Sequence, residues 1–319
     1  MNVTRRQILR VGGAAMAAGT LPSAFATTAK YPERPIELIV PWGPGGGADQ
    51  LARLTGKLSE PILTQSMPIV NVPGGTGATG MAKLLASPAD GHSAAIYIAD
   101  SHALLVGKDA RWSMDSIIPA AVMIQAPSFL FVAQNSRFKS WLDFAAEAKE
   151  KSGQLKVATL GFGSVDDFTL TYLGARGIKV VQVPFSKPSE RYISILGGHA
   201  DALYEQAGDV AQFLNSGQMR PLIVFSNQRF EAFKDVPCSK ELGFEITLPQ
   251  FRAIVLRGGT QPERLKIFSD ALTKVAALPG FRKFLKEQFA DEKSFLPAEP
   301  AAAFIKRQLE DMRAAVKQS

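Results

Sequence analysis

Short apolar runs alternate with amphipathic stretches along most of the chain. The first run, at 36–40, predicts a buried strand, and Leu51, Leu54 and Leu58 then follow the spacing of one helix face. Further strands are predicted at 68–72, 94–99, 129–133, 155–160, 179–183, 201–204, 221–225 and 251–256. Helices are predicted at 140–151, 167–174, 188–196, 208–216, 262–278, 280–288 and 300–317. This alternation predicts an α/β fold with mostly parallel sheets and helices on both faces.

The predicted strands fall into two groups, and the chain after 262 is helical. A chain of 319 residues has room for two domains. If the chain begins one domain, forms the second and then returns to complete the first, it crosses between the domains twice. The strands predicted at 129–133 and 251–256 are placed to make these two crossings. We therefore expect lobe 1 at 30–128 and 252–319, and lobe 2 at 129–251.

The first 26 residues predict an export signal. Arg5 and Arg6 are followed by an uncharged stretch at 11–21 and by Ser-Ala-Phe-Ala at 23–26. The paired arginines indicate a twin-arginine signal, and the alternative is an ordinary secretory signal that carries two arginines. Eleven residues span only about 16 Å as a helix, too little to cross a bilayer. We expect a soluble mature protein outside the cytoplasm.

The composition excludes several classes of site. The chain is 46% hydrophobic and 20% charged, which is typical of a globular protein. Cys238 is the only cysteine, so neither an internal disulfide nor a cysteine-based metal site can form. The three histidines lie far apart in sequence, and we expect no metal site and no catalytic residues. The net charge of +7 comes without a block of basic residues, which argues against nucleic-acid binding.

Two glycine-rich turns each join a predicted strand to a helix. They lie at 41–49 (PWGPGGGAD) and at 160–167 (LGFGSVDD), one in each half of the chain. Glycine permits a tight turn, and the free N–H groups at a helix N-terminus favour an anion. The two turns could face each other across a cleft between the domains, where ligands bind in α/β folds. The alternative is that both are structural turns, with Ser164 or Asp166 capping the second helix.

A third turn, at 75–80 (GTGATG), matches the dinucleotide-binding pattern, with Asp100 twenty residues after its last glycine. It supports an alternative function, an exported dinucleotide-dependent oxidoreductase. Pro73 and Gly74 lengthen this turn, and it follows the second predicted strand rather than the first, which argues against that alternative.

Together these motifs resemble the substrate-binding proteins of tripartite tricarboxylate transporters, the Bug family. The most specific similarity covers 31–49, where Trp42 replaces the usual Phe. Further similar segments lie at 71–77, 88–92, 183–185, 196–201, 216–222 and 235–237. The resemblance accounts for 75–80 as a turn of the family rather than a nucleotide site.

The resemblance implies a two-lobe periplasmic-binding-protein fold, similar to type II, with a hinged cleft. It implies a monomeric periplasmic receptor, not an enzyme and without a cofactor, that captures a small organic acid. The receptor would pass this acid to membrane permease subunits, or would present it to a sensor kinase. The ligand carboxylate is expected mainly on backbone amides and waters at the two turns. The implied site residues are Trp42, Pro44, Gly45, Gly46, Asp49, Ala99, Asp100, Ser101, Gly161, Phe162, Gly163, Ser164, Asp167, Tyr204 and Glu205.

Several acidic residues depart from the family pattern. Asp166 and Asp167 stand where small or uncharged residues are usual, and Asp100 stands where Thr or Ser is common. Either these acids point outward, or some point inward and meet a cationic or donor-rich pole of the ligand. Asp100 and Glu205 are the favoured inward candidates because both end strands. The ligand could be a dicarboxylate, a tricarboxylate, an aromatic acid or an amino acid.

Overall fold

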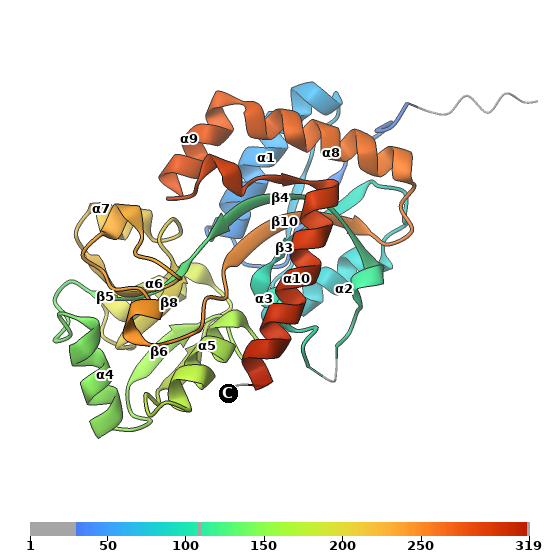
Figure 1. Ribbon diagram of the computed structural model, residues 1–319. Coiled ribbons are helices and arrows are strands. Elements are labelled where there is room, and N and C mark those ends of the chain that lie inside the picture. The colour runs from blue at the N-terminus through green and yellow to red at the C-terminus, as the bar shows by residue number, and fades with distance from the viewer. Residues whose placement is uncertain (1–29, 108–109, 318–319) are drawn as a thin grey trace, which may run out of the picture. The chain divides into compact units, whose positions relative to one another are not determined.

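The computed structural model describes residues 30–107 and 110–317 (Figure 1). The predicted export signal lies outside these residues. The chain from Tyr31 onward forms one compact unit, which is described here by itself. In the described part of the chain, no helix is long and apolar enough to cross a membrane.

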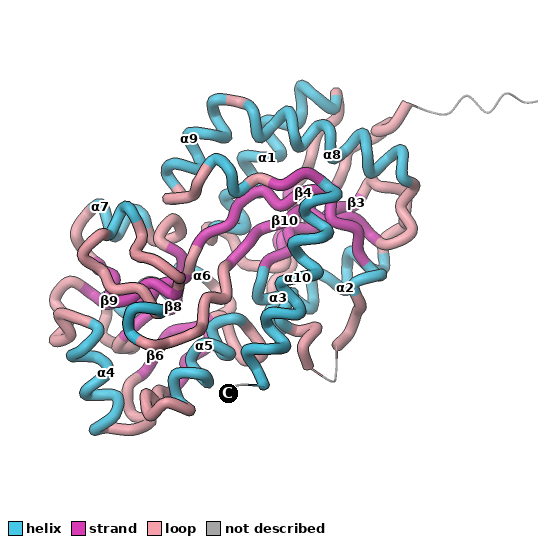
Figure 2. The backbone as a smooth tube through the Cα atoms, in the orientation of Figure 1, coloured by secondary structure: helices cyan, strands magenta, loops and turns pink. Residues whose placement is uncertain are grey.

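The first sheet has six strands in the order β11-β4-β10-β3-β1-β2. The strands β1, β2 and β3 pair in parallel, and β10 runs antiparallel to both β3 and β4. The strands β3, β10 and β4 are labelled in Figure 2. The six strands are β1 (Glu37–Val40), β2 (Ile69–Asn71), β3 (Ser93–Ile98), β4 (Ile117–Ala126), β10 (Gln250–Arg257) and β11 (Leu296–Pro297). The helices α1 (Gly47–Leu63), α2 (Ala78–Ala86), α3 (Ala99–Ala103), α8 (Pro262–Ala277), α9 (Pro279–Glu287) and α10 (Ala298–Lys317) complete this first half.

The second sheet has five strands in the order β7-β6-β8-β5-β9. The strands β6, β7 and β8 pair in parallel, and β5 runs antiparallel to its two neighbours. The five strands are β5 (Ser128–Ala133), β6 (Lys156–Thr159), β7 (Val181–Pro184), β8 (Ala202–Gln206) and β9 (Met219–Phe225). The helices α4 (Trp141–Glu150), α5 (Val165–Gly174), α6 (Pro188–Leu196) and α7 (Ala211–Asn215) complete the second half. The predicted class, two mixed α/β sheets with helices, is confirmed.

The chain passes between the two sheets twice. Pro127 alone separates β4 from β5, and a longer segment, 226–249, leads back from β9 to β10. The strands β4 and β10 pair along their lengths, so the two crossings start side by side. The proposed lobe boundaries, at 128/129 and 251/252, stay a prediction.

Strand β4 is the main element that the sequence analysis did not predict. Its run IIPAAVMIQA contains Pro119, which removes a ladder hydrogen bond and is unusual in a central strand. In the structure Pro119 lies opposite Val255, beside a register shift between Ile254 and Val255. A bulge is one of the few places in a sheet that tolerate proline.

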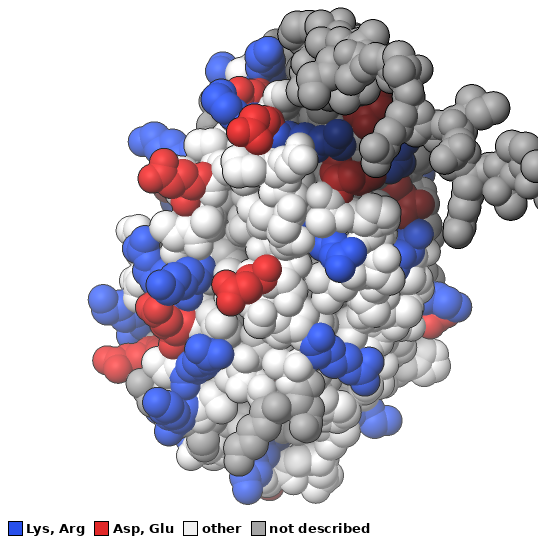
Figure 3. All heavy atoms as spheres, turned by 90° about the vertical axis from the view of Figure 1, so that its right-hand side faces the viewer, with Lys and Arg blue, Asp and Glu red and all other residues white. Residues whose placement is uncertain are grey.

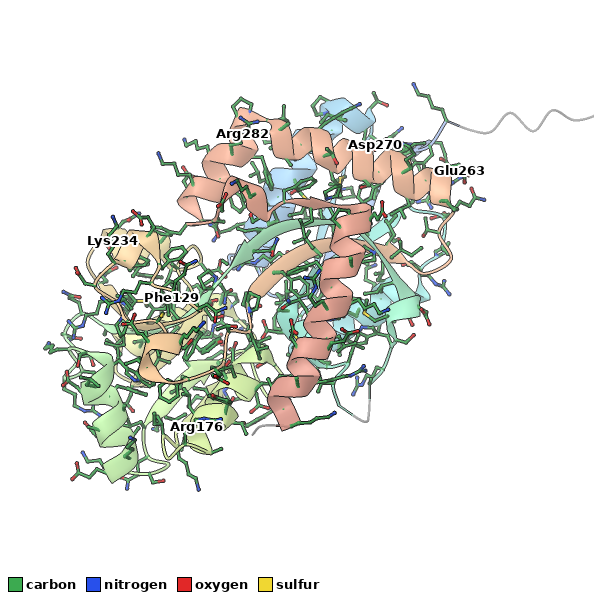
Figure 4. The ribbon with its side chains drawn as sticks, viewed as in Figure 1. Phe129, Arg176, Lys234, Glu263, Asp270 and Arg282 are labelled. Carbon is green, nitrogen blue, oxygen red and sulfur yellow. The ribbon has the colours of Figure 1, made fainter. Side chains whose placement is uncertain are left out.

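Buried side chains of both halves form one continuous cluster. It contains Tyr97 and Phe251 from the first sheet together with Leu130 and Tyr204 from the second. A separate cluster fills the far face of the second sheet and includes Phe129, labelled in Figure 4. The predicted capping box at the start of α4 is confirmed, since Ser140 accepts a hydrogen bond from the amide of Asp143.

Candidate functional site

The first glycine-rich turn follows β1 and opens α1. Asp49, in the first turn of that helix, reaches back and accepts a hydrogen bond from the amide of Gly45 at 3.0 Å. It also accepts one from Asn71 at 3.0 Å and pairs with Arg53 at 2.9 Å. Burial opposes ionisation, but these hydrogen bonds outweigh it and hold the pKa of Asp49 below its ordinary value. The side chain of Asp49 therefore closes the turn from within.

The second glycine-rich turn, between β6 and α5, is built the same way. Asp167 accepts a hydrogen bond from the amide of Gly163 at 2.8 Å and another from Gln182 at 2.6 Å. Ser164 caps α5 by accepting from the amide of Asp167 at 3.2 Å, as the structural alternative expected. Gly161 and Gly163 have φ angles of 135° and 74°, which other residues rarely adopt. Both turns thus repeat one arrangement, a glycine amide bound by an aspartate four residues later.

Each turn lies close against the opposite half. A Cβ atom on Gly46 would come within 2.7 Å of the Cγ atom of Pro188, at the start of α6. A Cβ atom on Gly161 would lie 3.2 Å from the hydroxyl of Thr76, which donates to the carbonyl of Phe162 at 3.4 Å. The glycines at these positions therefore allow the two halves to approach.

Asp100 lies between the halves and is fully buried. Its carboxylate accepts hydrogen bonds from the amide of Val165 at the start of α5, at 3.0 Å, and from Gln250 on β10, at 2.9 Å. Burial raises the pKa of Asp100 to about 6. The neighbouring Asp166 is also buried, and burial together with the negative charge of Asp100 raises its pKa well above the ordinary value. Asp100 therefore occupies one of the second-turn amides that the resemblance assigns to a ligand.

Glu205, at the end of β8, also points inward. It forms a buried ion pair with Arg191 of α6 and accepts a hydrogen bond from the amide of Gln206 at 3.0 Å. Burial raises the pKa of Glu205 to about 7, although the charge of Arg191 opposes the shift. Asp100 and Glu205 are both buried, and their partners are protein groups. Asp166, for which the sequence left both placements open, is buried as well, and it accepts a hydrogen bond from the amide of Leu160 at 2.8 Å.

A second buried ion pair, unlike the first, joins the two halves. Arg252 on β10 donates to Asp209 at 2.5 Å and to Gln206 at 3.2 Å. Asp209 and Arg252 were not among the predicted site residues. Asp209 follows the end of β8 and directly succeeds Gly208, so the rule that ligands gather at strand ends could have pointed to it.

Of the other predicted site residues, four are buried and three are exposed. Tyr204 points under α5, where its hydroxyl lies 3.0 Å from that of Thr169, so it supports the second turn rather than lining a cavity. Trp42, Ala99 and Ser101 are buried beside the first turn. Pro44, Gly45 and Phe162 are exposed, and the Phe162 side chain is 66% accessible at the tip of its turn.

A cavity of ≈ 460 Å³ adjoins the first turn and reaches across to the second half. Gly45 is the predicted site residue that lines it. The other lining residues are Gln50, Ser189, Tyr192, Ile193, Gly208, Asp209, Ala211, Gln212, Phe213, Glu287 and Gln288. Among the residues that the structure describes, no group of His, Cys, Asp and Glu could hold a metal ion.

The turn at 75–80 packs against the first glycine-rich turn. A Cβ atom on Gly77 would come within 2.3 Å of the Ser101 hydroxyl, and one on Gly80 within 2.6 Å of the Pro41 Cα atom. Asp100, which the dinucleotide pattern would place on a ribose, is bound by protein groups instead. Glycine at these two positions is explained by packing alone.

On the face drawn in Figure 3, basic and acidic side chains are interspersed.

Comparison with known proteins gives a consistent result. A family model described as "Tripartite tricarboxylate transporter family receptor" matches residues 51–318. Protein BugT of Bordetella pertussis is 28% identical over 293 residues, which are 88% of each chain. A TctC solute-binding protein from Polaromonas is 28% identical, with a TM-score of 0.65 over 91% of this chain and all of that one. MatC from Rhodopseudomonas palustris, solved with bound malate, is 21% identical, with a TM-score of 0.81 over 90% of this chain and all of that one.

Proposed function

The chain belongs to the tripartite tricarboxylate transporter receptor family, and from this premise we propose that it is a periplasmic solute-binding protein. It captures a small carboxylate-bearing metabolite between its two glycine-rich turns and delivers it to membrane permease subunits. We also propose that the export signal is cleaved and that the two crossings next to β4 and β10 act as a hinge. Its lobes are 30–128 with 252–319, and 129–251.

The observation that carries the proposal is the construction of the first turn. The N-cap of α1 is Gly46, which has no side chain to bind the free amides of the first helical turn. Asp49 binds only the amide of Gly45 in this turn. The helix start therefore offers amides and the positive end of its dipole to an anion, beside a cavity large enough for a metabolite.

Hydrogen bonds from these amides to a carboxylate can supply the binding free energy that a receptor needs. A hydrogen bond to a charged acceptor contributes about 1.5–3 kcal/mol. Three or four such bonds approach the ~8 kcal/mol of micromolar binding. The malate seen in MatC belongs to the ligand class that such a site would take.

Calorimetric titration of the mature protein with organic acids and their methyl esters tests the proposal. The free acid should bind at least tenfold more tightly than its ester, because an ester offers no full negative charge to the amides. Gly46→Ala should weaken acid binding at least tenfold, because its Cβ atom meets Pro188 at 2.7 Å. Gly43→Ala is the matched control, since its Cβ atom would lie at an ordinary 3.5 Å from Pro188. Equal binding of acid and ester would refute the proposal.

A further inference from the structure

The two glycine-rich turns differ in how their amides are used. In the second turn, side chains of the protein itself accept hydrogen bonds from the amides of Leu160, Gly163, Val165 and Asp167. Three of the four acceptors belong to the turn and to the start of α5, and the fourth is Asp100 from α3 of the first half. The first turn has no such arrangement, since α1 starts at a glycine N-cap without a side-chain hydrogen bond.

Asp100 stands where a helix N-terminus binds an anion. Its carboxylate accepts from the amide of Val165, the first residue of α5, at 3.0 Å, and α5 is ten residues long. The positive end of the helix dipole therefore acts on this carboxylate. Asp100 and Val165 are both 0% accessible. A carboxylate of the protein thus fills, across the two halves, a position that a ligand carboxylate would otherwise take.

This position lies close to the start of α1. Gln250 and Arg252 are two residues apart on β10 and so lie on the same face of the strand. Gln250 donates to Asp100 at 2.9 Å, whereas Arg252 lies against Gly47, where a Cβ atom would come within 2.5 Å of its guanidinium group. Two residues of a strand cover about 7 Å. A short dicarboxylate with one end at the start of α1 can span that distance.

We infer that Asp100 is a specificity-determining residue, which fills the anion position of the second turn and so selects ligands with one carboxylate over ligands with two. The inference rests on the proposed function, in which the ligand carboxylate lies at the start of α1. A second ligand carboxylate would meet Asp100 and the buried Asp166 at an amide that is already bound. Like charges repel strongly where water is excluded. Arg191, the cation that acts on Asp100, is itself paired with Glu205.

Pairs of acids in which a carboxylate replaces a methyl group test the inference by calorimetry on the mature protein. Suitable pairs are pentanoate with glutarate, hexanoate with adipate, and 4-methylbenzoate with benzene-1,4-dicarboxylate. In at least one pair the monocarboxylate should bind ten or more times as tightly as the dicarboxylate. Asp100→Ser removes the charge and frees the amide of Val165, so it should reduce this ratio at least tenfold. Asp270→Ser, the same substitution at an exposed residue of α8, is the matched control and should leave the ratio unchanged.

Formate gives a second test that does not depend on the ligand. Asp100→Ala removes a group of the size of formate from the start of α5. Sodium formate at about 0.2 M and pH 7.5 should therefore raise the midpoint of thermal unfolding of this variant by roughly 2 °C or more, relative to sodium chloride. The wild type and Asp100→Asn are the controls, because their side chains still fill the position. Neither should gain more than a small fraction of that shift.

The outcomes separate the two proposals. If the dicarboxylates bind as tightly as their partners, or if Asp100→Ser leaves the ratio at the wild-type value, the inference is wrong and the proposed function stands. Formate that stabilises all three proteins equally, or none of them, would also overturn the inference. If methyl hexanoate binds as tightly as hexanoate, the carboxylate is unused and the proposed function fails instead. If none of the six acids binds, both fail.

Discussion

Replacing Asp100 with asparagine should remove a pH-dependent loss of stability, measured as the free energy of unfolding. The carboxyl group of Asp100 is fully buried between the two halves, and burial raises its pKa from an ordinary 3.8 to about 6. Asparagine has nearly the same shape and does not titrate. Its oxygen can still accept from Val165, and the amide of Gln250 can turn to accept from its nitrogen.

The size and sign of the effect follow from proton binding. One unit of pKa difference between the folded and unfolded chain corresponds to about 1.4 kcal/mol, so the shift of Asp100 corresponds to ~3 kcal/mol. Between pH 3.8 and about 6 the folded chain keeps the Asp100 proton while the unfolded chain has released it. The free energy of unfolding therefore falls as the pH rises through this window. The asparagine variant lacks this dependence.

Urea unfolding between about pH 4 and pH 7.5 measures the difference. The variant's free energy of unfolding, relative to the wild type, should rise by ~3 kcal/mol across the window and then level off. The neighbouring Asp166 adds in the same direction, because losing the Asp100 charge lowers the pKa of Asp166 toward its ordinary value. Asp270→Asn is the control, an exposed residue on α8 that pairs with Lys266 (Figure 4). Parallel curves for Asp100→Asn and the wild type would refute the reasoning.

Three further predictions concern other parts of the chain. Arg191→Met should lower the free energy of unfolding, measured in urea, by about 3–5 kcal/mol, because it leaves Glu205 buried without its partner. Adding Glu205→Gln should restore most of that loss, and a double variant as unstable as Arg191→Met would contradict this. Ser140→Ala should cost about 1 kcal/mol in the same assay through loss of the α4 capping box, and no change would show that the cap is redundant. Replacing both Arg5 and Arg6 with lysine should block export as followed by cell fractionation, and unaffected export would favour an ordinary secretory signal.

The sequence was sufficient to predict the class of fold and the two glycine-rich turns. Glycines between a buried strand and the start of a helix form a tight turn, so the local sequence pattern was enough to predict these two turns. Strand β4 was missed because Pro119 argues against a strand unless a bulge is known to face it, and the bulge depends on β10 more than a hundred residues later.

The roles of individual acids could not be predicted from one sequence. Asp49 and Asp167 were expected to line the ligand site, yet their carboxylates bind glycine amides of their own turns. Asp100 and Glu205 are buried, and their partners lie on other elements of the fold, which one sequence does not reveal. Asp209 gave only the weak signal of following a strand, and its partner Arg252 is brought beside it by β10, more than forty residues later in the chain.

The central claim is that the chain holds a small organic acid, and native mass spectrometry of the freshly purified protein tests it most directly. We predict one bound molecule per chain which, when released and identified, carries a free carboxylate. Release of a dinucleotide, or of a molecule with no acidic group, would contradict the account.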